Sequence, residues 1–510
     1  MTARRHAGAK PSVQIDTMTE IEFKALAAQG YNRIPLMLEC LADLDTPLSL
    51  YLKLVDRERR QNSFLLESVV GGERFGRYSF IGLPASGLVR AQGDWIEVVR
   101  DGVVVETRQG DPLEFVREFQ QRFRVALTPG LPRFCGGLAG YFGYDVVRFI
   151  EPRLGPSRKP DPIGTPDVLL LLVDELAIVD NLQGKLYLIV YADPTRPEAF
   201  SAARKRLREL QARLQRPAFE PEDQPRPEGE VRRDFAKADY LAAVDRAREY
   251  IIAGDLMQVQ VGQCLRKPFA YPALSLYRAL RSINPSPYMY YYDFGDFQVV
   301  GASPEILVRQ ESLEPAEGRP GTRVTIRPLA GTRPRGMTPQ EDRVLAEELL
   351  ADPKERAEHL MLIDLARNDI GRLATIGSVR VTDQMVIEKY SHVQHIVSNV
   401  EGELRPGVDG IDVLRATFPA GTLTGAPKVR AMELIDELEP TKRGLYGGAC
   451  GYLSWSGEMD LAIAIRTGIV KDGTLHVQAA AGVVYDSIAE NEWRETEVKA
   501  RALLRAAELV

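Results

Sequence analysis

The sequence predicts an α+β fold, and three observations lead to this prediction. Strand-like segments dominate the first two hundred residues, and Trp95–Thr107 and Leu186–Tyr191 are clear examples. After about residue 235, strands and long helices are mixed, but they do not alternate at the spacing of parallel strand–helix–strand units. Hydrophobic residues make up 45% and charged residues 27% of the 510 positions, which is the balance of a folded globular protein.

Five helices can be placed from amphipathic spacing and from the signals at their ends. The first two cover 197–214 and 239–252, and Gly254 terminates the second. Two more begin at Thr338 and Asp352, each followed by proline and then by a glutamate at the third helical position. The helix that begins at Asp352 is expected to end near residue 365. The last helix runs from about 487 to 509, with these residues facing inward: Trp493, Ala500, Leu503, Leu504 and Ala507. Strands are expected in the second half at Phe297–Val300, Leu453–Trp455, Ala462–Ile465 and Leu475–Ala481.

One change of composition divides the chain. Residues 216–230 contain four prolines and many charges with little to bury, which is typical of a linker or a long surface loop. We therefore expect a flexible tail at 1–15, an N-terminal region at 16–215, a linker at 216–235 and a C-terminal region at 236–510.

Composition argues against several classes of protein. The longest apolar run, Leu186–Ala192, has seven residues, whereas a membrane helix needs about 20. The first ten residues are basic, but no apolar segment follows them, so we expect no secretory signal. A net charge of −6 and the lack of a basic block argue against nucleic-acid binding. The four cysteines have no paired spacing, which indicates free thiols in a reducing cytoplasm: Cys40, Cys135, Cys264 and Cys450.

Two helices carry acidic residues at spacings that bring them onto one face. Glu355 and Glu358 are three positions apart, and Glu492, Glu495 and Lys499 follow at spacings of three and four. Carboxylates from two helices suit a Mg²⁺ ion that also holds an anionic substrate. Each helix alone also permits another interpretation, because Glu355 fits a capping box and Glu495 fits a surface ion pair with Lys499.

Histidine is scarce, and one glycine-rich loop invites a phosphate interpretation that fails. His392 and His395 share a face of their segment, and a catalytic role and a structural hydrogen-bonding role both remain open. The loop Gly421–Lys428 has the glycines of a nucleotide P-loop, but Val429 stands where a hydroxyl residue should hold Mg²⁺.

Four long strings, taken together, resemble one family. They are PLAGTRPR at 328–335, EHLMLIDLARND at 358–369, PAGTLTGAPK at 419–428 and NEWRETEVK at 491–499. The chain resembles the chorismate-utilising enzymes, and among them the large subunits of anthranilate synthases. The resemblance covers nearly the whole chain and is densest over 238–506. It implies two packed antiparallel-rich β-sheets flanked by helices, with the active site in a cleft of the C-terminal region.

The resemblance also assigns roles to individual residues. Glu358 and Glu495 match the ligands of Mg²⁺, with Glu355 and Glu492 holding metal-bound waters. The positions that match substrate binding, for chorismate, are Gly331, Thr332, Tyr446, Arg466, Ala480, Ala481 and Gly482. The positions that match catalytic residues are Glu305 as general acid, His395 in pyruvate elimination, Thr422 and Lys499. Ala480 is a departure, because many relatives have glycine there.

Two positions indicate which branch of the family the chain resembles. Relatives that add water carry a lysine base where this chain has Gln258, and a neutral amide cannot deprotonate water, whereas ammonia is already nucleophilic. The alternative, aminodeoxychorismate synthase, often has a nucleophilic lysine at the position of Ala330. The implied reaction converts chorismate and ammonia to 2-amino-2-deoxyisochorismate and then to anthranilate and pyruvate. A non-catalytic subunit that binds tryptophan is a third alternative, which the presence of the matching catalytic residues disfavours.

The resemblance further implies partners and regulation. No cysteine lies in a Gly-x-Cys-x-Gly elbow, so we expect a separate glutamine amidotransferase subunit, component II, to supply ammonia. The expected assembly is a homodimer or a heterotetramer with that subunit. The region 16–215 then carries feedback inhibition by tryptophan, and 236–510 carries catalysis. The matching inhibitor positions are Glu67, Ser68, Pro287, Tyr288 and Met289. Composition alone leaves open that Pro287–Met289 simply begins a strand.

Overall fold

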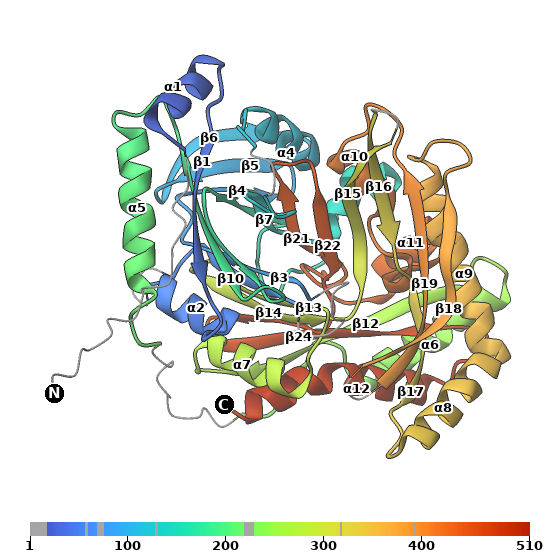
Figure 1. The fold of residues 1–510 in the computed structure, drawn as a ribbon. Coiled ribbons are helices and arrows are strands. Elements are labelled where there is room, and N and C mark those ends of the chain that lie inside the picture. Colours follow the sequence, from blue (N-terminus) through green and yellow to red (C-terminus); the bar gives the residue numbers. More distant parts are fainter. Residues whose placement is uncertain are drawn as a thin grey trace.

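Two large antiparallel sheets form the centre of the molecule, as expected (Figure 1). The computed structural model describes residues 18–56, 60–68, 76–127, 131–218, 229–316, 319–390 and 393–510. The first sheet has, in spatial order, β1 (Ile34–Leu41), β10 (Lys185–Ala192), β9 (Glu175–Asp180), β3 (Tyr78–Gly82), β2 (Ser63–Glu67), β13 (Tyr288–Asp293), β14 (Phe297–Ser303), β23 (Thr467–Lys471), β24 (Thr474–Val483), β12 (Gln258–Pro268) and β11 (Arg232–Arg233), and β20 (Gly425–Ala426) also pairs with β12.

The second sheet is built in the same way. Its spatial order is β17 (Leu329–Pro334), β19 (Val393–Glu403), β16 (Arg319–Ile326), β15 (Ile306–Ala316), β22 (Met459–Ile463), β21 (Ala449–Ser454), β7 (Gly137–Phe142), β8 (Val168–Val173), β4 (Gly87–Gln92), β5 (Trp95–Arg100) and β6 (Val103–Gln109), and β18 (Arg380–Lys389) also pairs with β19. The predicted strand Trp95–Thr107 is therefore a hairpin, because Asp101 and Gly102 turn the chain with positive φ.

Helices cover the outer faces of both sheets (Figure 1). α5 packs on β1 and β10, α12 packs on β24 and α7, and α9 packs on β17 and β19. The α-helices within the described residues are α1 (Glu20–Ala28), α2 (Pro47–Leu54), α4 (Pro112–Gln121), α5 (Ala199–Arg213), α6 (Lys237–Ile252), α7 (Ala273–Ile283), α8 (Pro339–Ala351), α9 (Pro353–Gly371), α10 (Gly410–Thr417), α11 (Lys428–Leu438) and α12 (Ala489–Glu508); short 3₁₀ turns are η2 (Tyr144–Phe149), η3 (Pro152–Leu154) and η4 (Gly421–Leu423).

The helix ends follow the predicted capping signals, with two differences. Thr338 and Glu341 form the reciprocal capping box of α8. Asp352 caps α9 by accepting from the backbone N–H groups of Lys354 and Glu355, but the Glu355 side chain does not return a bond to the cap, so the capping-box interpretation of Glu355 is wrong. α9 also continues to Gly371 rather than ending near residue 365, because Ala366 and Ile370 extend its buried stripe.

An aromatic layer fills the space between the two sheets. Phe64 and Tyr292 from the first sheet lie with their ring centroids 5.7 Å apart, and Phe134 stacks on Tyr452 of the second sheet at 4.3 Å. Phe64 and Phe134 join the two groups at 6.3 Å. Edge and stacked contacts of this kind stabilise the fold beyond the burial of the rings themselves. This layer therefore holds the two sheets face to face.

Strands on either side of the predicted linker share both sheets. In the first sheet β2 pairs with β13, and in the second β7 pairs with β21, so each sheet is continuous across sequence positions far apart. The division into regulatory and catalytic regions stays a prediction. The predicted tail at 1–15, residues 219–228 of the predicted linker and His392 lie outside the described residues.

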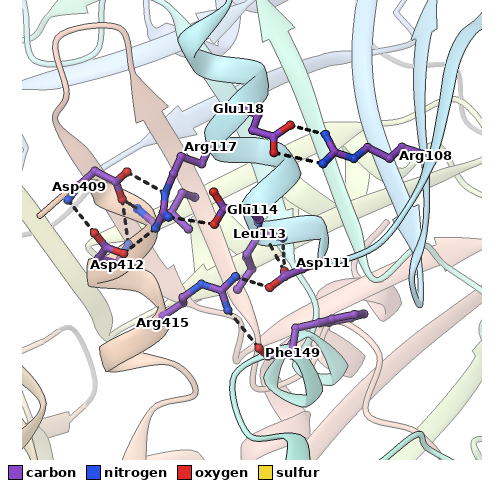
Figure 2. Close-up of polar contacts among 11 residues, drawn as sticks. Arg108, Asp111, Leu113, Glu114, Arg117, Glu118, Phe149, Asp409, Asp412 and Arg415 are labelled. Carbon is purple, nitrogen blue, oxygen red and sulfur yellow. Dashed lines mark hydrogen bonds and ion pairs between the residues drawn. The ribbon is translucent and has the colours of Figure 1, made fainter.

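Ion pairs also join the two parts of the chain, at the contact of α4 with α10 (Figure 2). Arg117 of α4 donates to Asp412 at 2.5 Å and pairs with Asp409, the N-cap of α10, at 2.8 Å. In return, Arg415 of α10 pairs with Asp111, the N-cap of α4. Each helix thus neutralises the capping carboxylate of the other, and α10 leads directly into the loop 418–424.

The four cysteines are free thiols, as predicted, and all four are buried. Among the helices of the described ranges, none combines the length and apolarity that crossing a membrane requires.

Candidate active site

Glu305, the predicted general acid, is buried where β14 passes into β15. Burial raises the pKa of its carboxyl group from 4.5 to about 8, although Thr422, Arg466, Lys499 and the backbone N–H of Leu329 all act in the opposite direction. The carboxyl group is therefore mostly protonated at neutral pH, as a proton donor must be. A pocket with about 370 Å³ of empty space adjoins Glu305 and Thr422 and is bounded by α9. The structure thus brings together four predicted residues from four separate segments.

His395 lies on β19 opposite Thr332 of β17. Its Nδ1 is 2.9 Å from the carbonyl oxygen of Gly331 and 3.1 Å from the Thr332 hydroxyl. Because a carbonyl oxygen only accepts, Nδ1 carries the proton and Nε2 has a free lone pair. Burial lowers the pKa of His395 to about 4, so the ring is neutral at pH 7. The backbone of Gly331 has φ +68°, and a side chain there would meet Glu355 at 3.1 Å.

The predicted substrate-binding residues Ala480–Gly482 lie within strand β24 and pair with β12. A Cβ atom at Gly482 would lie 2.9 Å from the side-chain amide nitrogens of Gln258 and Gln260, so both amides lie close to the backbone of Gly482. The buried methyl group of Ala480 faces Gly262, whose missing side chain leaves room for it. The methyl group of Ala480 therefore packs against β12 at Gly262.

Tyr446 and Arg466 supply polar groups at the same place. Burial raises the pKa of Tyr446 to about 12, so the phenol is neutral and can donate. Arg466 has φ +51°, a strained conformation for an arginine, and within the described residues its guanidinium forms no ion pair or hydrogen bond. Burial lowers its pKa, while Tyr446, Glu305 and Glu495 raise it. A desolvated guanidinium without a partner suits a carboxylate of a bound molecule.

The four predicted metal-side glutamates come from the starts of α9 and α12. Lys354 of α9 pairs with Asp486 at 2.9 Å, and the charges of Glu358 and Glu492 both act on Lys354, so the two helix starts are neighbours. Glu358 accepts from Gln258 at 3.0 Å, and Glu495 pairs with Lys499 at 2.6 Å. Among the residues that the structure describes, no three His, Cys, Asp or Glu side chains converge at ligand distance. Convergence of the four carboxylates stays a prediction.

The donor set nevertheless fits a hard divalent cation. Burial and the charge of Glu358 raise the pKa of Glu355, and burial and the charge of Glu495 raise the pKa of Glu492. Like charges thus oppose one another on both helices, and a divalent cation would relieve that repulsion. All four groups offer oxygen atoms, which Mg²⁺ prefers. Lys499 does pair with Glu495, as the alternative interpretation holds, but it also donates to the carbonyl oxygen of Ala480 at 2.7 Å and so joins α12 to β24.

Comparison with known proteins identifies the family of this site. Residues 63–505 match the family described as chorismate binding enzyme. The chain belongs to that family. Anthranilate synthase component 1 of Neisseria meningitidis serogroup C is 56% identical over 96% of this chain and 98% of the relative, and that of Pseudomonas putida is 55% identical over 96% and 99%. The crystal structure of anthranilate synthase component I from Streptococcus pneumoniae covers 91% of this chain and 98% of its own, with 37% identity and a TM-score of 0.74.

This chorismate-binding enzyme has a second pocket, away from Glu305, at the junction of β2 and β13. It has about 610 Å³ of empty space, including the part open to solvent, and all five predicted inhibitor residues line it. Aromatic rings dominate its remaining wall, at Tyr78, Phe80, Tyr290, Tyr292 and Tyr452. The strand interpretation of Pro287–Met289 is also right in part, since β13 begins at Tyr288.

The carboxylate of Glu67 is held by two residues of α7. It accepts from the Tyr277 hydroxyl at 2.5 Å and from Arg281 at 3.0 and 3.1 Å, both on α7. Side chains alternate along β2, so Glu67 faces the helices while Leu66 faces the other sheet. Glu67 is therefore already hydrogen-bonded to α7, and its role in inhibitor binding stays a prediction.

Sequence reasoning missed several polar groups in this chorismate-binding enzyme. Arg309 donates to Asp460 at 2.9 Å, and Tyr288 donates to Asp460 at 3.1 Å, so this second pocket has its own buried charges. Arg443 and Glu439 form another buried pair, at 2.6 Å, beside β12. The partners of the first pair are distant in sequence, and those of the second are four positions apart but follow the end of α11, so helical spacing does not pair them.

Proposed function

We propose that the chain is the large component of an anthranilate synthase, which converts chorismate and ammonia to anthranilate and pyruvate. The observation that carries this proposal is the protonated Glu305 carboxyl group, in a buried site that also holds Thr422, Arg466 and Lys499. The named relatives, which are components 1 of anthranilate synthases at 55–56% identity, support it.

The residues can divide the chemistry as follows. Arg466 and Tyr446 bind the enolpyruvyl carboxylate, and the backbone of Ala480–Gly482 supports the ring. Glu305 donates its proton to the C4 hydroxyl, which leaves as water while ammonia adds at C2 and loses a proton. The neutral amide of Gln258 can orient ammonia without acting as a base. The product of this step is 2-amino-2-deoxyisochorismate.

The second step is the elimination of pyruvate. The proton on C2 must leave as the bond between C3 and the enolpyruvyl oxygen breaks, and the ring then becomes aromatic. His395 can accept this proton at Nε2, because its ring is neutral and Nε2 has a free lone pair. The Nδ1–H bond to Gly331 holds the ring orientation.

Magnesium belongs to the proposed function. Glu358 and Glu495 would hold Mg²⁺, with Glu355 and Glu492 supporting its waters. The ion supplies a positive charge that offsets the repulsion between these glutamates and the ring carboxylate of chorismate. The chain's own contribution is to place the acidic residues on the rigid starts of α9 and α12.

Partners, location and regulation complete the proposal. A glutamine amidotransferase, component II, supplies ammonia, as the name "component 1" of the relatives suggests, and the buried free thiols suit a cytoplasmic enzyme. Tryptophan binds the pocket at the junction of β2 and β13, where Ser68 and Pro287–Met289 lie beside the aromatic wall. The regulatory part is then 16–215 and the catalytic part is 236–510.

One assay tests the proposed activity. The purified chain with chorismate, ammonium chloride and Mg²⁺ should develop the fluorescence of anthranilate without an added lyase. Accumulation of a non-fluorescent amino product would instead identify an aminodeoxychorismate synthase. Absence of any turnover, with chorismate binding retained, would refute the proposal.

A further inference from the structure

Arg443 and Glu439 form a buried ion pair behind the proposed active site. Both follow α11, and their side chains are only 3% and 6% exposed. Three bonds connect them: Arg443 Nε donates to both carboxylate oxygens at 3.2 and 3.0 Å, and Nη2 donates to Oε1 at 2.6 Å. A buried pair is weak evidence for stability, since apolar residues of similar volume often replace it without loss. The remaining contacts of this pair are therefore the informative ones.

The guanidinium also bonds two backbone segments of the site. Nη1 donates to the carbonyl oxygen of Leu423 at 2.7 Å, and Nη2 donates to that of Gln260 at 3.2 Å. Leu423 directly follows Thr422, which faces Glu305. Gln260 lies on β12, where its side chain approaches Gly482 of β24. One planar group thus holds the loop of Thr422 at a set distance from the strand that borders Ala480–Gly482.

Glu439 extends the same connection. Its Oε1 accepts from the backbone N–H of Gly262 at 2.8 Å, and Gly262 pairs with Ala480 across β12 and β24. The Arg443 guanidinium lies 5.7 Å from the ring centroid of Tyr446, and the backbone N–H of Tyr446 donates to the carbonyl oxygen of Arg443 at 3.0 Å. The pair therefore contacts the segments that carry Thr422 and Tyr446 and the strand β12 that borders Ala480–Gly482, and it touches none of the reacting positions itself.

We propose that Arg443, oriented by Glu439, is a positioning residue that sets the location of the Thr422 loop and of β12 relative to Glu305. Its role in turnover rests on the proposed function. Displacement of a catalytic group by about 1 Å can reduce turnover about 100-fold, so loss of these bonds should affect kcat strongly.

A paired replacement separates positioning from stability. Arg443→Met leaves the Glu439 carboxylate buried without its ion-pair partner, so the melting temperature of this variant should be lower than that of the wild type. Arg443→Met with Glu439→Leu removes both charges, so its melting temperature should return close to that of the wild type, while kcat stays at least about 30-fold lower. Thr422 lowers the pKa of Glu305, so a shift of Thr422 should raise that pKa. The alkaline limb of the rate profile should then move to higher pH. A double variant with kcat within threefold of wild type would overturn the proposal.

Two further variants serve as a control for lost stability and as a substitute if the double variant does not fold. Arg148 is a matched control: its side chain is 10% exposed, it pairs with Asp436 of α11 at 2.8 Å, and it donates to the Gly155 carbonyl oxygen at 3.0 Å. Among the described residues, none of its hydrogen bonds reaches a segment of the proposed active site. Arg148→Met should lower the melting temperature and leave kcat within twofold. If the double variant does not fold, Arg443→Lys decides by kcat, because lysine keeps the charge but not the planar fork; retention of kcat within threefold would overturn the proposal.

The wild-type assay distinguishes this inference from the proposed function. An inactive wild type would refute the function whatever the variants do. Hydrogen exchange at the Gly262 amide would then still test positioning. Faster exchange in Arg443→Lys at an unchanged melting temperature supports it, and unchanged exchange contradicts it.

Discussion

Replacement of Glu305 by glutamine tests whether a buried, protonated carboxyl group is the acid of the reaction. Glutamine has nearly the same shape and remains neutral, so it keeps the packing between β14 and β15 and removes only the transferable proton. General acid catalysis contributes about 10²–10⁴-fold, and kcat should fall by that factor. The variant should bind chorismate with little change.

The pKa of Glu305 also sets the pH dependence. With a pKa of about 8, about nine-tenths of the carboxyl groups are protonated at pH 7 and about one-tenth at pH 9, so the acid-dependent rate should fall about tenfold between these values. The folded state holds this proton more tightly than the unfolded state, whose ordinary value is 4.5, so stability falls as pH rises from about 4.5 to about 8 and beyond. Between pH 7 and 9 the free energy of unfolding of the wild type should fall by about 1.4 kcal/mol relative to that of Glu305→Gln. This fall is confined to the pH range in which the unfolded carboxyl group is ionised and the folded one still holds protons.

The assay must separate the fall of the rate between pH 7 and 9 from the change in free ammonia over the same range. Free ammonia increases with pH, so total ammonium is adjusted at each pH to hold the free base constant, and anthranilate fluorescence is followed with saturating chorismate. Urea unfolding of both proteins at pH 7 and 9 measures the stability difference. A variant that keeps full turnover, or a wild-type rate that does not fall between pH 7 and 9 at constant free ammonia, would refute the acid assignment.

Four other outcomes are expected. Glu495→Gln should reduce kcat at least about 100-fold and abolish the rise in melting temperature that Mg²⁺ gives the wild type; an unchanged thermal response to Mg²⁺ would remove Glu495 from the metal site. Ser68→Arg should weaken tryptophan binding, measured by calorimetry, at least tenfold, and equal affinity would place the inhibitor elsewhere. Arg415→Ala should lower the free energy of unfolding by about 1–2 kcal/mol through the loss of its pair with Asp111, measured by urea titration, and no change would show that the α4–α10 contacts are energetically neutral. His395 is already neutral at pH 7, so the rate at constant free ammonia should show no acidic limb between pH 6 and 8, and a titration near 6.5 would contradict its burial.

Local signals predict much of the molecule. Caps and helical spacing place α8, α9 and α12, and spacing alone puts Glu355 with Glu358 and Glu492 with Glu495 on common faces. Alternation along β2 also contains the information that Glu67 and Leu66 face opposite ways, although only the structure shows that α7 holds the carboxylate.

Long-range contacts are what the sequence does not reveal. The pairing of β2 with β13 and of β7 with β21 joins segments more than two hundred residues apart, and no local pattern specifies these partners. The role of Arg443 likewise depends on two backbone carbonyl oxygens from distant segments, and backbone groups carry no sequence signature. The residues of the active site could therefore be named from motifs, while the groups that hold them in place could not.

The shared sheets have a consequence for cutting the chain. A single proteolytic nick between residues 218 and 229 would not release either part, since each would have to strip half of both sheets from the other and expose the aromatic layer. The nicked enzyme should elute as one particle, and the separately produced fragments should regain activity only when refolded together.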